Sequence, residues 1–417
     1  MLPWLAHAAL FLGPGHDEDR RRRAVWRTSL WLALLVAFVP VAWLLALVLA
    51  VAALAADVRN GREDRLAASV ATPLVATLVL LLPWTVASWT HQGAAAWLFE
   101  AGLPLPRLTE VPGFWDTLAG RPGDGAPAWM AVGVLLAALV ALARPDTRTG
   151  VLRAWTVLAA AMLVTAVLAV GSYATSTFPE QKLWLGFPLV VAQGAAITAA
   201  ALAGTGIRRR LAGANFGWRQ PIGVLVVVLA AVSPVVSAVW WAWSGSGDPL
   251  DRGRATDVPT YMTDDAAANP DHGILEIRGS RERGFTYLLL RGPGLRTGDD
   301  TALPSTADQA PLTRVVEDLA TAPEPADVAA LGRYGVSYVY APGPADISLV
   351  GNLDSVSGVT TGSAVQPGAR AWNVEATPTG TDLVRDPDPL RRWLLALQGI
   401  AVVVVAVLAA PTRKVVR

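Results

Sequence analysis

The stretch that decides the fold class is PIGVLVVVLAAVSPVVSAVWWAW, residues Pro221–Trp243, which contains no charged side chain. A helix of about 20 apolar residues crosses the hydrocarbon core of a bilayer, because only a helix satisfies its own backbone hydrogen bonds in lipid. This stretch therefore indicates a membrane-spanning helix. Six further stretches have the same character: Ser29–Ala56, Leu66–Thr90, Ala128–Ala143, Ala154–Ala174, Leu183–Ala203 and Trp393–Ala410.

The composition of the whole chain agrees with a lipid environment. The 417 residues are 53% hydrophobic and 16% charged, whereas soluble domains carry roughly 25% charged residues. Seven such stretches buried in a soluble protein would leave too little polar surface. We therefore predict a polytopic α-helical protein of the plasma membrane with about seven spans and the lipid bilayer as its first partner.

The charges fall into two opposite groups. Residues 244–389 hold 21 of the 33 acids but only 11 of the 34 basic residues, so 12 acids and 23 bases remain elsewhere. Such asymmetry predicts two environments. We expect four parts: an N-terminal apolar and basic segment (1–28), a multi-span region (29–243), an acidic extracytoplasmic domain (244–389), and a last span with a basic tail (390–417).

The orientation follows from the short loops, because cytoplasmic loops carry an excess of Lys and Arg. The basic regions 20–27, 144–153, 208–219 and 413–417 should be cytoplasmic, which includes the C-terminus. The acidic loop His91–Pro127, the loop Thr175–Lys182 and residues 244–389 should then lie outside.

The first apolar stretch, Ser29–Ala56, does not fit a single membrane crossing. Basic residues flank it on both sides, so its two ends should be cytoplasmic. Pro40 near its middle removes a helical hydrogen bond and breaks or kinks a helix. We favour a re-entrant helical pair broken near Pro40, with one tilted span as the alternative. Met1–Gly13 is too short to span, and it resembles the end of a helix whose beginning lies outside this chain, as expected for a fragment or an internal start.

The acidic segment shows the patterns of a small α/β domain. Leu312, Val315, Val316 and Leu319 repeat with helical spacing, and Gly, Pro, Asp and Thr fill the gaps between elements. The expected strands are Gly273–Arg278, Phe285–Arg291, Gly335–Ala341 and Ala371–Glu375, and further helices are expected at Pro325–Leu331 and Ile347–Leu353.

Several classes of chemistry have no motif in this sequence. The chain has no Cys and four separated His residues, which argues against disulfides, thiolate catalysis and a His-based zinc site. Gly292–Gly298 lacks the spacing of a dinucleotide fingerprint, and no GxSxG motif is present. The acid pairs Asp264–Asp265, Asp299–Asp300 and Asp386/Asp388 are interpreted as solvated turn residues. No cofactor, metal or nucleic-acid partner is expected.

The loop His91–Pro127 carries the candidate catalytic residues. It is long and apolar for a connection between spans, so we expect it to lie in the membrane interface at the outer surface. Its acids Glu100, Glu110 and Asp116 are of the type that takes a proton from an acceptor hydroxyl. The alternative is a loop with ordinary solvated acids. Glu180 and Lys182 form a weaker version of the same pattern.

Two regions of the chain resemble a known family. These are WLFEAGLPLP (97–106) followed by RPGDGAPAWMAVGVLLAALVAL (121–142), and the C-terminal segments FTYLLLRGPGLRTGDD (285–300), LGRYGVSYVY (331–340), NLDSVSGV (352–359) and ARAWNVE (369–375). Together they are similar to the membrane-embedded C-terminal half of the large actinobacterial family 2 glycosyltransferases. In that family a separate cytoplasmic N-terminal domain carries the nucleotide-sugar chemistry. This chain has no counterpart of that domain, so no catalytic residue is carried over.

The resemblance implies the membrane and extracytoplasmic portion of a cell-envelope glycosyltransferase that handles a lipid-linked or nascent glycan. A cytoplasmic nucleotide-sugar transferase domain is an expected partner, and a polyprenyl-phosphate-linked sugar is an expected substrate. In one version of this hypothesis the chain itself is the transferase, with Glu100, Glu110 or Asp116 as base. The alternative from another class is a non-enzymatic membrane scaffold or export partner for envelope polymers.

Overall fold

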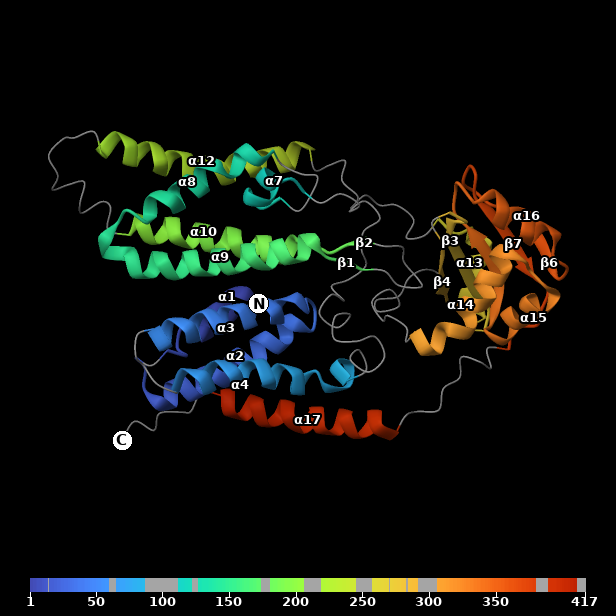
Figure 1. Ribbon diagram of the computed structural model, residues 1–417, viewed down its shortest axis with the longest axis horizontal. Helices are drawn as coiled ribbons and strands as arrows, with labels where there is room; N and C mark the ends of the chain where they lie inside the picture. The colour runs from blue at the N-terminus through green and yellow to red at the C-terminus, as the bar shows by residue number, and fades with distance from the viewer. Residues whose placement is uncertain are drawn as a thin grey trace.

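The computed structural model describes residues 1–13, 15–59, 65–86, 112–121, 127–173, 181–205, 219–244, 257–269, 271–282, 284–291, 306–379 and 389–410. These residues form a set of long, roughly parallel helices and a separate α/β domain beyond one end of the helices (Figure 1). The architecture is that of a membrane protein with an extramembrane α/β domain.

Among the residues that the structure describes, five helices are long and apolar enough to cross a membrane. They are α3 (Val41–Arg59), α9 (Arg148–Val170), α10 (Gly186–Gly204), α12 (Arg219–Ser244) and α17 (Pro389–Ala409). The two other predicted stretches form shorter apolar helices: α4 (Arg65–Leu80), and η1 (Ala128–Ala131) continued by α8 (Val132–Ala141). The count of seven spans therefore stays a prediction.

The predicted break near Pro40 is confirmed. Helix α2 (Glu18–Val36) ends four residues before Pro40, and α3 begins directly after it. Proline cannot donate a backbone hydrogen bond, so it stands where one helix has ended and the next starts. The break fits both the re-entrant pair and the single span, since α3 alone is long enough to cross a membrane, so the topology of this stretch stays a prediction. Helix α2 packs against α1 (Leu2–Ala9), α4 and α17.

Small residues hold the second group of helices together. Helices α9 and α10 meet through alanines, among them Ala161 and Ala196, which are almost completely buried. Gly133 of α8 lies so close to α12 that a Cβ atom would be 2.3 Å from the Leu229 carbonyl oxygen. Small side chains are favoured at such contacts because helices in lipid associate through close van der Waals packing.

Two arginines of the predicted cytoplasmic regions donate hydrogen bonds to carbonyl groups at the C-terminal ends of helices. Arg144 donates from Nη2 to the carbonyl of Thr205 at 2.6 Å, and from Nη1 to that of Ala203, at the end of α10. Arg27 donates from Nε to the carbonyl of Ala409 at 2.9 Å, at the end of α17. A cation at a helix C-terminus is stabilised by the free carbonyl groups there.

The α/β domain contains a five-stranded sheet with the strand order β4-β3-β5-β7-β6. Strands β3 and β5 are parallel, and all other neighbouring pairs are antiparallel. The strands are β3 (Gly273–Ser280), β4 (Gly284–Leu290), β5 (Val336–Ala341), β6 (Val359–Gly362) and β7 (Arg370–Val374). A separate two-stranded ribbon, β1 (Ser172–Tyr173) with β2 (Gln181–Lys182), joins α9 to α10.

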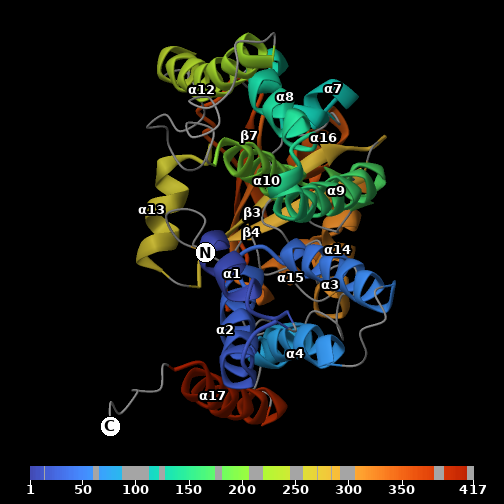
Figure 2. The same ribbon diagram turned by 90° about the vertical axis from the view of Figure 1, so that its left-hand side faces the viewer.

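Helices cover both faces of the five-stranded sheet. Helix α13 (Thr260–Ala268) lies on one face, and α14 (Thr306–Thr321), α15 (Pro325–Arg333) and α16 (Ile347–Ser355) lie on the other (Figure 2). Adjacent residues of β3 point to opposite faces of the sheet and need cover on both. Ile274 packs on the α13 side and Leu275 on the other side, and both are fully buried. All the elements predicted for this segment are confirmed, whereas α13 and β6 were not predicted.

Candidate functional site

The structure describes some of the acidic residues that were predicted in the outer loops. Glu100 and Glu110, and Glu180 of the neighbouring loop, lie outside the described residues. Asp116 is on the short helix α7 (Phe114–Leu118), and Lys182 is in β2. The structure therefore describes one of the three candidate bases, and Glu100 and Glu110 stay predictions.

The carboxylate of Asp116 is held by its own helix terminus. Arg121 Nη1 lies 2.6 Å from Asp116 Oδ1, and the Arg121 backbone N–H donates to the Asp116 carbonyl at 2.8 Å. The Asp116 side chain is 36% exposed. Its negative charge is therefore paired but still accessible, and to act as a base it would have to exchange Arg121 for an acceptor hydroxyl.

Helix α7 is fastened to the membrane helices through Gln193 of α10. The Gln193 side-chain amide donates to the carbonyl of Gly120 at 3.0 Å. Gly120 has a φ of 76°, and a Cβ atom there would lie 2.2 Å from Gln193 Nε2. This position therefore requires glycine. Since Gln193 is seven residues along α10 and a helix rises 1.5 Å per residue, the contact lies about 10 Å from the start of that helix.

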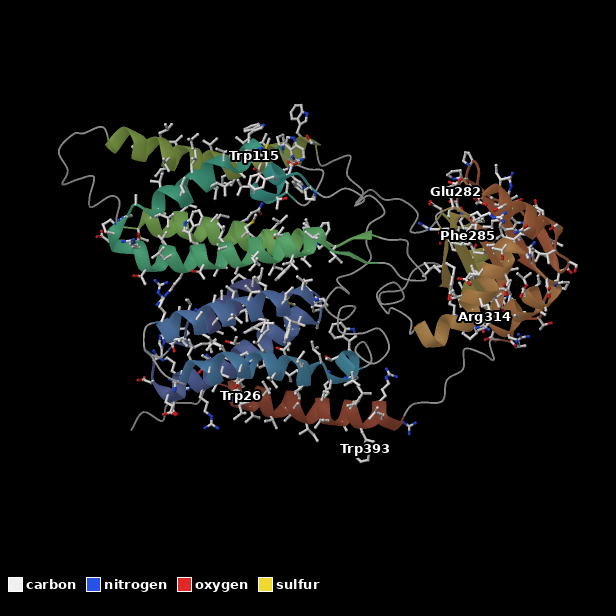
Figure 3. All side chains as sticks on the ribbon, viewed as in Figure 1. Trp26, Trp115, Glu282, Phe285, Arg314 and Trp393 are labelled. Atoms are coloured by element: carbon white, nitrogen blue, oxygen red, sulfur yellow. The ribbon has the colours of Figure 1, made fainter. Side chains whose placement is uncertain are left out.

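Exposed aromatic side chains lie on α7 itself and on η1, which follows it in the chain. Phe114 and Trp115 of α7 are 73% and 72% exposed, and Trp129 of η1 is 62% exposed. Figure 3 labels Trp115 at the membrane helices. Large exposed aromatic residues at the end of a membrane helix favour the interface between hydrocarbon and headgroups. The interfacial position of the loop, with Asp116 near the lipid headgroups, stays a prediction.

A second cluster of polar residues lies in the α/β domain, around Asp265 near the end of α13. Its Oδ2 atom is 2.7 Å from Nδ1 of His272 and accepts a hydrogen bond from the Tyr338 hydroxyl at 2.8 Å. Its Oδ1 atom accepts from the Asn269 side chain at 2.7 Å. Asp265 was interpreted from the sequence as a solvated turn acid, and that interpretation is wrong because three side chains converge on its carboxylate.

These contacts shift the pKa values of Asp265 and Tyr338. Partial burial acts to raise the pKa of Asp265, but the hydrogen bonds from His272, Tyr338 and Asn269 outweigh it and hold the pKa below its usual value. Burial and the hydrogen bond to Asp265 raise the pKa of Tyr338 to about 12. The carboxylate is therefore charged and the phenol neutral over the physiological range.

Tyr261 completes the cluster from the exposed side of α13. Its ring meets that of Tyr338 edge to face, with the centroids 5.9 Å apart. Tyr261 is 40% exposed and His272 about one third exposed, so an aromatic edge and an imidazole face solvent together. An imidazole oriented by a carboxylate can relay a proton or bind a hydroxyl group. Sequence reasoning missed this cluster, since no recognised motif links Asp265, His272 and Tyr338.

No group of three His, Asp or Glu side chains that could hold a metal ion occurs among the described residues. The paired acids Asp299–Asp300 and Asp386/Asp388 fall outside those residues.

Comparison with known proteins gives one match. No family model and no curated protein sequence matches the chain. Among solved structures, it is similar to the cryo-EM structure of the arabinofuranosyltransferase AftD from Mycobacteria, with 17% sequence identity and a TM-score of 0.44. The match covers 91% of this chain and 29% of the AftD chain, so this chain spans less than a third of that protein. A likeness of this degree assigns neither a family nor a reaction.

Proposed function

We propose that this chain is the membrane and extracytoplasmic portion of a cell-envelope glycosyltransferase that holds a lipid-linked or nascent glycan. The observation that carries the proposal is the attachment of α7 to α10. It presents the Asp116 carboxylate beside the exposed rings of Phe114 and Trp115. A lipid-linked sugar has its reacting centre at the headgroup level, and a carboxylate there is placed to accept a proton from a sugar hydroxyl.

The α/β domain supports the same proposal. It precedes the last membrane helix in the chain, and it offers Tyr261, His272 and Asp265 at its surface. Aromatic rings beside charged hydrogen-bonding groups suit sugar hydroxyls and the apolar faces of sugar rings. The domain would therefore hold the glycan while transfer takes place at the membrane.

The ion pair between Asp116 and Arg121 favours a second candidate function. A base already paired with a guanidinium is less free to remove a proton, and the pair would then only shape the outer surface. On this alternative the chain is a non-enzymatic scaffold or export partner for envelope polymers, and the chemistry belongs to another protein.

The test is glycosyl transfer in membranes that contain the full chain. Radiolabelled polyprenyl-phosphate sugars and nucleotide sugars are supplied in separate reactions. The wild-type chain is compared with Glu100→Gln, Glu110→Gln and Asp116→Asn, and with the control Glu282→Gln in the exposed turn between β3 and β4 (Figure 3). Removal of a general base lowers the rate by about 10²–10⁴-fold.

Transfer from the lipid donor that is lost in one of the three variants, but kept in Glu282→Gln, supports an enzyme with its base in the outer loop. Transfer restored only by co-expression of a cytoplasmic transferase domain supports the membrane half of a divided enzyme. Failure of transfer in both settings would contradict the proposal and favour the scaffold.

A further inference from the structure

A groove of 980 Å³ lies between α1, α2 and α17, and Leu80 and Leu81 also line it. Its volume is at the upper end of the range of about 300–1,000 Å³ found for small-molecule sites. The groove does not involve α7 or the α/β domain. Its occupant is therefore a question separate from glycosyl transfer.

The groove is hollow because the facing helices present small side chains. Helix α2 contributes Ala24, Ala33 and Ala37, and the end of α17 contributes Ala406 and Ala409. Larger apolar residues form its walls. Trp31 of α2 stacks on Trp4 of α1 with the ring centroids 6.0 Å apart and the planes at 18°, and Leu30, Leu34 and Val402 extend the apolar lining.

The part of the groove beside the N-terminal half of α2 is positively charged. Arg20 and Arg27 of α2 both line it. Arg27 is anchored by the hydrogen bond from its Nε to the Ala409 carbonyl, which leaves the other N–H groups of the guanidinium for an anion. In the part of the chain that the structure describes, no acidic side chain forms an ion pair with either arginine.

We propose that this groove binds an anionic phospholipid, with the phosphate between Arg20 and Arg27 and one acyl chain along the alanine-lined floor toward Leu34 and Leu80. Guanidinium groups match the geometry of phosphate oxygens and bind them with charge-assisted hydrogen bonds. Basic pockets between membrane helices on the cytoplasmic side bind anionic headgroups. The charge and the apolar lining together select an amphiphile over a free anion or a neutral lipid.

The proposal is tested by native mass spectrometry of the full chain purified in mild detergent and supplied with phosphatidylglycerol or phosphatidylcholine of the same acyl composition. The wild-type chain should retain phosphatidylglycerol about tenfold more tightly, because the choline cation of phosphatidylcholine cancels the negative charge of the phosphate that both lipids carry. The double variant Arg20→Gln/Arg27→Gln should lose that preference. Its control is Arg22→Gln/Arg153→Gln, since both of these arginines are exposed and neither lines the groove.

A second pair of variants tests the apolar part of the groove. Ala406→Trp fills the groove and should reduce phosphatidylglycerol binding about tenfold while the arginines stay in place, as expected for excluding an acyl chain from its apolar site. Val407→Trp is the matched control, because Val407 is 68% exposed and does not line the groove. Elution as a single species in size-exclusion chromatography and unchanged helical circular dichroism confirm that each variant is folded.

Three outcomes would overturn the proposal. Equal retention of the two lipids would mean that the arginines do not select an anionic headgroup. Phosphatidylglycerol binding that survives the double arginine substitution would place the lipid elsewhere. Loss of binding in Arg20→Gln/Arg27→Gln but not in Ala406→Trp would leave a headgroup contact at the surface without an acyl chain in the groove.

Discussion

The Nδ1 atom of His272 lies 2.7 Å from Oδ2 of Asp265, and the Tyr338 hydroxyl donates to the same oxygen from a residue 73 positions away in the chain. One carboxylate thus joins helix α13, the turn that follows it and the central strand β5. This contact connects α13, which the sequence did not predict, to the sheet, and three predictions follow from it.

Asp265→Asn should destabilise the α/β domain by about 1–3 kcal/mol, because an amide accepts hydrogen bonds more weakly than a carboxylate and leaves a partner less satisfied. Hydrogen exchange of the purified full chain should show faster exchange in α13 and β5. Asp264→Asn is the control, since the neighbouring Asp264 side chain is exposed. Equal exchange in the two variants would show that the cluster adds no stability.

The same carboxylate should give the domain a characteristic acid sensitivity. The folded pKa of Asp265 lies below the unfolded value of 3.8. Its contribution to stability is therefore complete above pH 3.8 and is lost as the pH falls through the folded pKa. Denaturation of the full chain at a series of pH values should show this loss, and the loss should be smaller in Asp265→Asn. Identical profiles would contradict the prediction.

Tyr338 should ionise only in strong alkali. Its pKa is raised to about 12 from 10.0, so its contribution to stability is complete below pH 10.0 and is lost as the pH rises toward 12. Absorbance titration of the full chain near 295 nm should contain a tyrosine transition near pH 12 that is missing in Tyr338→Phe. A titration in which that variant loses an ordinary transition near pH 10 instead would refute the assignment.

Gly120→Ala should detach α7 from α10. The residue has a positive φ, and a Cβ atom would overlap the Gln193 side chain at 2.2 Å. Left-handed backbone strain costs a non-glycine residue on the order of 1–3 kcal/mol. We expect a lower melting temperature in detergent and faster exchange of residues 113–121. Gly194→Ala is the control, because its Cβ would meet nothing within 4 Å, and an effect as large in that variant would count against the contact.

Arg144→Gln should loosen the end of α10. The guanidinium donates to the Thr205 carbonyl at 2.6 Å, and a cation near the last carbonyls of a helix contributes about 0.3–2 kcal/mol. Hydrogen exchange near residues 203–205 should therefore quicken. Arg148→Gln removes an exposed charge from the same region and is the control. The prediction fails if the two variants exchange alike.

The sequence by itself determined the features that depend on local patterns. Long uncharged stretches predicted the apolar helices, because lipid tolerates only backbones that bond internally. Pro40 predicted the break between α2 and α3, because proline has no N–H to donate. Helical and strand periodicity located the confirmed elements of the α/β domain, since those patterns record which side chains are buried.

Only the tertiary structure decided which distant residues meet. Helix α13 was missed because TYMTDDAAA has a weak apolar pattern, and its burial comes from a sheet face assembled from later strands. The parallel pairing of β3 with β5 brings Tyr338 beside Asp265. The same holds for the lipid groove, whose walls come from opposite ends of the chain. These contacts depend on how elements pack, and packing leaves no signal at a fixed spacing along the sequence.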